Sequence, residues 1–132
     1  MKRLALIAGV LLLIAGAAGF VPALCPDGKL FGIFAVDTMH NIVHIATGIL
    51  ALALGAAGEV PARTFFRILG IVYAAVTVMG FVASRDGQVM GMAVNMADNF
   101  LHLAIAAVGL YLGFFWHREL PPSNRGPDLR GA

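Results

Sequence analysis

The chain has 132 residues, of which 60% are hydrophobic and 12% charged, and its mean hydropathy is +0.88. A soluble domain of this length could not cover so much apolar surface, so the composition excludes a water-soluble globular protein. The net charge of +2 reflects charges placed between apolar runs, which gives no support to nucleic-acid binding.

Four apolar runs follow one another along the chain. Because about 20 residues cross a hydrocarbon core, these runs predict four transmembrane helices. The predicted spans cover residues 4–24, 36–57, 65–83 and 91–116. We expect one four-helix transmembrane domain over residues 1–117. The polar, proline-rich end at residues 118–132 predicts a disordered cytoplasmic tail.

The first span resembles a signal peptide, since a short basic start precedes an apolar run with small residues. However, Gly9 and the Gly-Phe-Val segment 19–21 recur at the same spacing as Gly70 and the segment 80–82 in the third span. No signal peptide requires such a match, so we expect the first helix to be retained. Cys25 is the single cysteine, which excludes an internal disulfide.

Each half of the chain is typical of a helical hairpin. Asp-Gly pairs at 27–28 and 86–87 suit the turns, and Gly32 and Gly91 follow each pair at the same distance. Two hairpins make an even number of crossings, so both halves have the same orientation in the membrane. The predicted fold is an all-α integral membrane four-helix bundle made of two duplicated helical hairpins in parallel orientation.

The positive charges predict the topology. Seven lie at the ends or between the halves, against Lys29 and Arg85 on the other side; the seven are Lys2, Arg3, Arg63, Arg67, Arg118, Arg125 and Arg130. By the positive-inside rule, both termini are expected in the cytoplasm of a multi-pass protein.

A polar cluster opens the second span and recurs in the fourth, about 58 residues later. It consists of Asp37, His40, Asn41 and His44 in the first half, and of Asn95, Asp98, Asn99 and His102 in the second. Ionisable groups within a membrane cost at least ~2.5–3.5 kcal/mol each, so they need partners. Their helical spacing predicts one polar face per helix, both turned to the bundle interior at one depth near the outer surface.

The cluster offers the ligands of a metal site. His40 and His44 stand four residues apart, as do Asp98 and His102, a spacing that lets two side chains on one helix share an ion. Zinc, iron or copper accepts imidazole and carboxylate together. We therefore hypothesise a divalent metal held by His40, His44, Asp98 and His102. Asp37, Asn41, Asn95 and Asn99 would form a supporting polar network.

Three alternatives stay open. The cluster fits a hydrogen-bond network that only ties two helices together, in a noncatalytic structural or accessory subunit of a homo-oligomer or larger membrane complex. It also fits a proton or solute path, although the small apolar residues below the histidines argue that such a path is closed. A haem between His44 and His102 is the third alternative, which tight helix packing disfavours. No catalytic motif argues for an enzyme.

Several segments together resemble the family catalogued as domain of unknown function 4383 (DUF4383). They are Leu30-Phe31-Gly32-Ile33, His40-Asn41-Ile42-Val43-His44, Gly70-Ile71-Val72-Tyr73 and the segment 94–102 containing Asn-Met-Ala-Asp-Asn-Phe-Leu-His. The resemblance implies a small bacterial four-helix membrane protein, which we expect in the cytoplasmic membrane. It implies no established activity.

Overall fold

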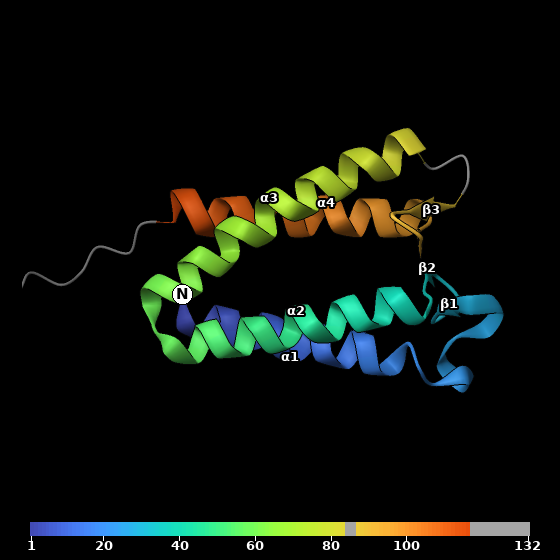
Figure 1. The fold of residues 1–132 in the computed structure, drawn as a ribbon, viewed down its shortest axis with the longest axis horizontal. Coiled ribbons are helices and arrows are strands. Elements are labelled where there is room, and N and C mark those ends of the chain that lie inside the picture. The colour runs from blue at the N-terminus through green and yellow to red at the C-terminus, as the bar shows by residue number, and fades with distance from the viewer. Residues whose placement is uncertain (84–86, 117–132) are drawn as a thin grey trace, which may run out of the picture.

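The computed structural model describes residues 1–83 and 87–116 and contains two pairs of helices that run along a common direction (Figure 1). The helices are α1 (Lys2–Ala18), α2 (Thr38–Ala57), α3 (Glu59–Ala83) and α4 (Met96–Leu110), and a π-helical turn (Tyr111–Phe115) extends α4. α1 packs on α2, and α3 packs on α4. This confirms the predicted all-α membrane bundle. The predicted tail at 118–132 lies outside the described residues.

In the described part of the chain, three helical segments are long and apolar enough to cross a membrane: Thr38–Ala57, Glu59–Val82 and Met96–Phe115. α1 has 17 residues and ends before the predicted limit of the 4–24 span. Two short 3₁₀ turns follow it, Pro22–Leu24 and Pro26–Gly28. Each begins with a proline, whose missing N–H and fixed ring prevent continuation of an α-helix.

The connection between the halves is shorter than the predicted spans imply. α2 ends at Ala57 and α3 already begins at Glu59, so Gly58 alone joins them. Gly58 has a φ of 145°, a conformation that side chains rarely adopt. Pro61 lies in the first turn of α3, where its missing N–H has no helical partner to lose.

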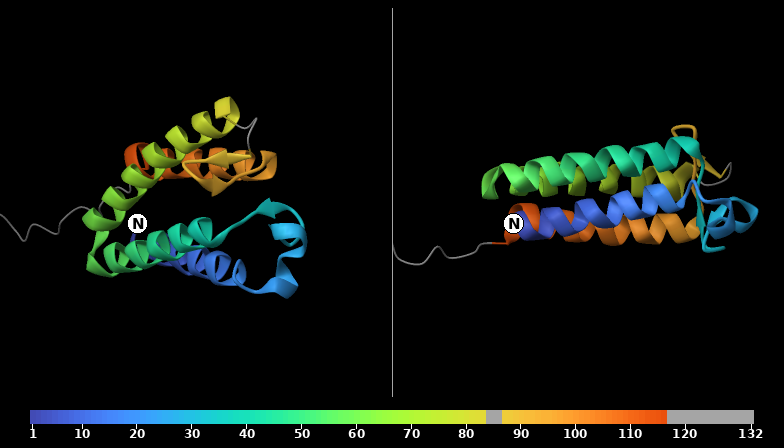
Figure 2. Two further views of the ribbon diagram at one scale, coloured as in Figure 1. Left: turned by 45° about the vertical axis from the view of Figure 1, so that its right-hand side comes forward. Right: turned by 90° about the horizontal axis from the view of Figure 1, so that it is seen from below.

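Each half also contains a small antiparallel β-hairpin, and neither was predicted. β1 (Lys29–Leu30) pairs with β2 (Phe34–Ala35), and β3 (Gln88–Val89) pairs with β4 (Met92–Ala93). β4 uses residues assigned to the predicted fourth span, so α4 begins at Met96 instead of residue 91. Figure 2 shows both hairpins at one end of the bundle, away from the N-terminus.

The parallel course of α2 and α4 agrees with the predicted orientation. Both helices start at the hairpin end and run toward the other end (Figure 1). Glycines let the helices of each pair approach closely. A Cβ at Gly48 would lie 2.9 Å from the carbonyl oxygen of Gly9, and one at Gly109 would lie 2.8 Å from Gly70 Cα. α2 therefore packs closely against α1, and α4 packs closely against α3.

Candidate functional site

The polar residues of the cluster that lie nearest the hairpins are at the starts of α2 and α4. Asp37 is the N-cap of α2, and its Oδ1 accepts the N–H of His40 at 2.8 Å. Asn95 is the N-cap of α4 and forms a capping box with Asp98, in which each side chain accepts the other's backbone N–H. These bonds satisfy N–H groups that lack a helical partner. The predicted network residues Asp37 and Asn95 and the predicted ligand Asp98 therefore cap helices.

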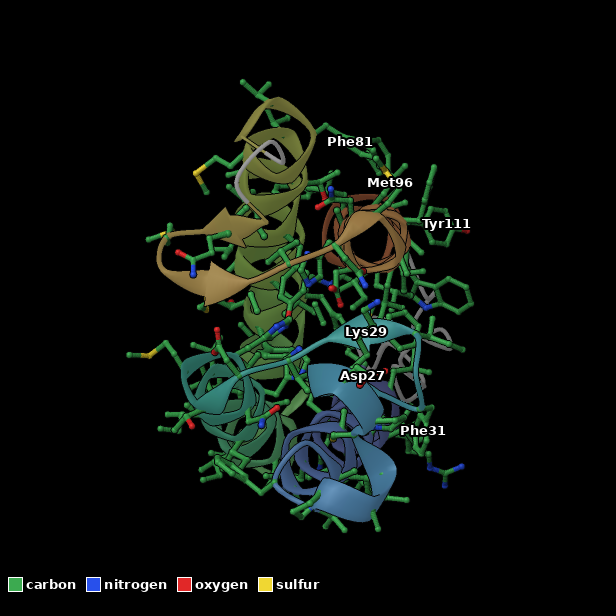
Figure 3. The ribbon with its side chains drawn as sticks, turned by 90° about the vertical axis from the view of Figure 1, so that its right-hand side faces the viewer. Asp27, Lys29, Phe31, Phe81, Met96 and Tyr111 are labelled. Carbon is green, nitrogen blue, oxygen red and sulfur yellow. The ribbon has the colours of Figure 1, made fainter. Side chains whose placement is uncertain are left out.

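The same two carboxylates also connect the two halves of the chain. Asp37 Oδ2 accepts the N–H of Ala93 in β4, and Asp98 Oδ2 accepts the N–H of Ala35 in β2 at 3.0 Å. Each hairpin thus donates a backbone N–H to the helix start of the opposite half. Viewed onto the hairpin end, the strands lie across the ends of the helices (Figure 3).

Two further hydrogen bonds cross between the halves with reversed polarity. The amide Nδ2 of Asn95 donates to the carbonyl oxygen of Ile33 at 2.7 Å. The imidazole Nδ1 of His40 lies 2.9 Å from the carbonyl oxygen of Ala93. His40 and Asp98 occupy equivalent positions in α2 and α4. His40 donates to the hairpin of the second half, whereas Asp98 accepts from the hairpin of the first half.

Asp37 lies outside the membrane-spanning segments, and its environment favours the charged carboxylate. Partial burial alone would raise its pKa, but the backbone N–H groups of His40 and Ala93 and the nearby His40 ring lower it. The net effect places the pKa of Asp37 below its usual value of 3.8.

Three histidines meet behind this layer of capping residues. His40 and His44 come from α2 and His102 from α4, and one ligand atom from each lies within 4.8 Å of the others. The rings of His40 and His44 are 4.6 Å apart between centroids, and those of His40 and His102 are 6.0 Å apart. His40 and His102 are buried. Three of the four predicted metal ligands therefore lie close together.

The side chains farther from the hairpins differ in their hydrogen bonding from the capping residues Asp37, Asn95 and Asp98. The Nδ1 atoms of His44 and His102 are buried and have no partner among the described residues. The same holds for Asn41 Oδ1 and for both amide atoms of Asn99. Because a buried polar group without a partner is costly, these are the atoms of the cluster that a ligand or weaker contacts would satisfy.

The amide oxygens of Asn41 and Asn99 have an explanation that does not involve a ligand. Asn41 packs on Gly19, and Asn99 packs on Gly80, so closely that a Cβ at either glycine would overlap the amide oxygen. Cα–H groups of glycine donate weak hydrogen bonds to oxygens at such close contacts, which leaves only the donor Asn99 Nδ2 without a partner among these amide atoms of the described residues. The two histidine nitrogens have no comparable explanation among these contacts.

Asp98, the fourth predicted ligand, does not belong to the group of ligand atoms that lie within 4.8 Å of one another. Its Oδ2 accepts two backbone N–H groups. Tyr73, which was not predicted to belong to the site, is a buried residue of α3 whose ring lies edge-on to the ring of His102, with 5.3 Å between centroids. A tyrosine in the middle of an apolar span was the available signal.

A family model described as domain of unknown function (DUF4383) matches residues 2–115, which confirms the resemblance noted in the sequence. No curated protein matches the chain, and no solved structure does either.

Proposed function

The chain belongs to the DUF4383 family, and from that premise and the histidine geometry we propose that this membrane protein binds a divalent transition-metal ion. His40 and His44 of α2 and His102 of α4 hold the ion between the two helix pairs. Imidazole suits zinc, iron and copper, and sites with three protein ligands keep a position for water or a further ligand.

The observation that carries this proposal is the pair of buried Nδ1 atoms on His44 and His102, which have no hydrogen-bond partner within residues 1–83 and 87–116. A metal ion is such a partner, because an unprotonated imidazole nitrogen donates its lone pair to the ion. The ring of His40 is oriented by the bond from its Nδ1 to the carbonyl oxygen of Ala93, which leaves its Nε2 to coordinate the ion.

Asp98 supports the proposed site from beside it. Its carboxylate is fixed by backbone N–H groups of Asn95 and Ala35, and its charge interacts with His40. That charge offsets part of the charge of a bound cation. Replacing Asp98 with asparagine should therefore weaken metal binding less than replacing His102 with alanine.

The two halves are proposed to be copies of one ancestral hairpin. Supporting this, the close glycine pairs Gly9–Gly48 and Gly70–Gly109 match, and so do the contacts Gly19–Asn41 and Gly80–Asn99. Each half also has the same order of helix, β-hairpin and capped helix.

We further propose a bacterial cytoplasmic membrane location with the hairpin end outside and both termini in the cytoplasm. Lys2, Arg3, Arg63 and Arg67 belong to the helix starts away from the hairpins, which supports this topology. Fusions of a green fluorescent protein and of alkaline phosphatase to the C-terminus test it. Fluorescence with an inactive phosphatase is expected, and the reverse result would overturn the topology.

The hydrogen bonds between the halves favour a second candidate. In a purely structural or accessory subunit, the bonds of Asp37, Asn95 and Asp98 would hold the bundle together for docking to a homo-oligomer or a larger complex. This candidate predicts that the histidines remain metal-free and that the protein is equally stable with and without metal.

Metal analysis separates the two candidates. The protein is purified in mild detergent, stripped with a chelator, reloaded with zinc, copper or iron, and analysed by mass spectrometry of the elements. We expect one ion per chain in the wild type, and loss of it in His44→Ala/His102→Ala. His117→Ala, the remaining histidine, is the matched control and should keep the ion. Equal, near-zero metal in all three proteins would overturn metal binding.

A further inference from the structure

The tips of both β-hairpins combine an unfavourable backbone conformation with exposed apolar side chains. Phe31 has a φ of 55° and Met90 a φ of 53°, and each is followed by a glycine with positive φ. The side chain of Phe31 is 62% exposed and that of Met90 is 77% exposed. Both residues occupy the same place, directly after the first strand of their hairpin.

The conformation does not match the chemistry of the residues. Tight hairpin turns with two positive φ values favour asparagine, aspartate or glycine at the first position. A large apolar side chain there is uncommon, because its Cβ crowds the backbone. In water, an exposed apolar side chain at this position would not stabilise the folded protein.

A large apolar residue with positive φ occurs in both hairpins although their loops differ in length. The first hairpin has three residues between its paired strands, Phe31 to Ile33, whereas the second has only Met90 and Gly91. Both loops nevertheless present a large apolar residue at the strained position. The large apolar residue is thus kept at this position although the two loops differ in length.

The surroundings of the tips are also apolar. In the view onto the hairpin end, Phe31 lies at the perimeter of the bundle and not over its centre (Figure 3). Other exposed apolar side chains belong to the helix ends and loops beside the hairpins; they are Phe20, Val21, Leu24, Ile33, Met39, Phe81 and Met96. The tips therefore belong to an end of the bundle that exposes several apolar side chains.

We propose that Phe31 and Met90 insert into the boundary between lipid headgroups and acyl chains and anchor the hairpin end of the bundle there. Lys29, two residues before Phe31, is exposed at the same end of the bundle, and its ammonium group can pair with lipid phosphate. The hydrophobic gain of burial in lipid compensates the backbone conformation at each tip. This inference is independent of metal binding.

Fluorescence quenching by lipid measures the depth of each tip. Phe31→Trp and Met90→Trp are made separately in a Trp116→Phe background and reconstituted into phosphatidylcholine–phosphatidylglycerol vesicles. The lipids carry bromine either near the start or near the end of their acyl chains. We expect stronger quenching by the shallow bromines. Ile49→Trp, on the exposed middle of α2, is the control and should respond more to the deep ones.

Water-exposed tips would overturn the proposal. In that case neither bromolipid quenches Phe31→Trp or Met90→Trp, and aqueous iodide quenches both. Seating against a protein partner would likewise leave both tips unquenched by bromolipid in the purified protein.

A second variant separates lipid insertion from turn strain. Phe31→Asn/Met90→Asn places a residue that favours positive φ at both tips. Both proteins are reconstituted into vesicles. If the tips insert into lipid, amide hydrogen exchange in both hairpins should be faster in the variant than in the wild type. Slower exchange in the variant would show that only the strain mattered, and would contradict the proposal.

Discussion

The imidazole Nδ1 of His40 lies 2.9 Å from the carbonyl oxygen of Ala93, which belongs to the hairpin of the other half. A carbonyl only accepts, so the neutral imidazole carries its proton on Nδ1. The Nε2 lone pair then faces away from the hairpin bond and is available to an ion. One hydrogen bond thus both joins the two halves and prepares a metal ligand.

This relationship predicts the tautomer of His40. In protein labelled with ¹⁵N-histidine at neutral pH, His40 should show a protonated Nδ1 and an unprotonated Nε2. Adding zinc should shift the Nε2 resonance of the wild type and leave that of His44→Ala/His102→Ala unchanged. A His40 ring protonated on Nε2 would contradict the prepared ligand.

The sequence predicted the histidine group but not the role of Asp98. His44 and His102 follow from helical spacing and from matched halves, because both place the residues at one depth on parallel helices. Asp98 has the same spacing to His102 as His40 has to His44. Its carboxylate is instead fixed by backbone N–H groups, one of them from Ala35 in β2.

That partner could not be inferred because the hairpins were not predicted. Two-residue strands are too short to show the alternation of a β-strand. Met92 and Ala93 are apolar, so composition alone could not distinguish them from the start of a span. The four helices were predictable because each is long and apolar, whereas their ends depend on prolines and caps that act locally.

The hydrogen bond between Asp37 and Ala93 predicts a stability difference. In Asp37→Asn the amide oxygen can still cap His40, but the N–H of Ala93 faces an amide nitrogen. Leaving that N–H without an acceptor should lower the free energy of unfolding by about 1–3 kcal/mol. SDS-induced unfolding in mixed micelles measures it. The exposed Asp27→Asn is the control and should stay close to wild type.

The lowered pKa of Asp37 gives this difference a pH dependence. A carboxyl whose pKa is lower in the folded state stabilises the protein fully above its unfolded pKa and loses that contribution as pH falls through the folded pKa. The advantage of wild type over Asp37→Asn should be constant near neutral pH and shrink below the usual value of 3.8. An advantage that grows on acidification would contradict the shift.

The contact between Gly80 and Asn99 predicts a pair of coupled substitutions. A Cβ at position 80 would overlap the amide of Asn99. Gly80→Ala should therefore lower the free energy of unfolding by about 1–3 kcal/mol, although alanine is the better helix former. Adding Asn99→Ala should remove most of that cost. In Gly70→Ala the new Cβ meets the backbone of Leu110 instead, so Asn99→Ala should give no rescue. Equal effects of Asn99→Ala on both glycine variants would refute a specific contact.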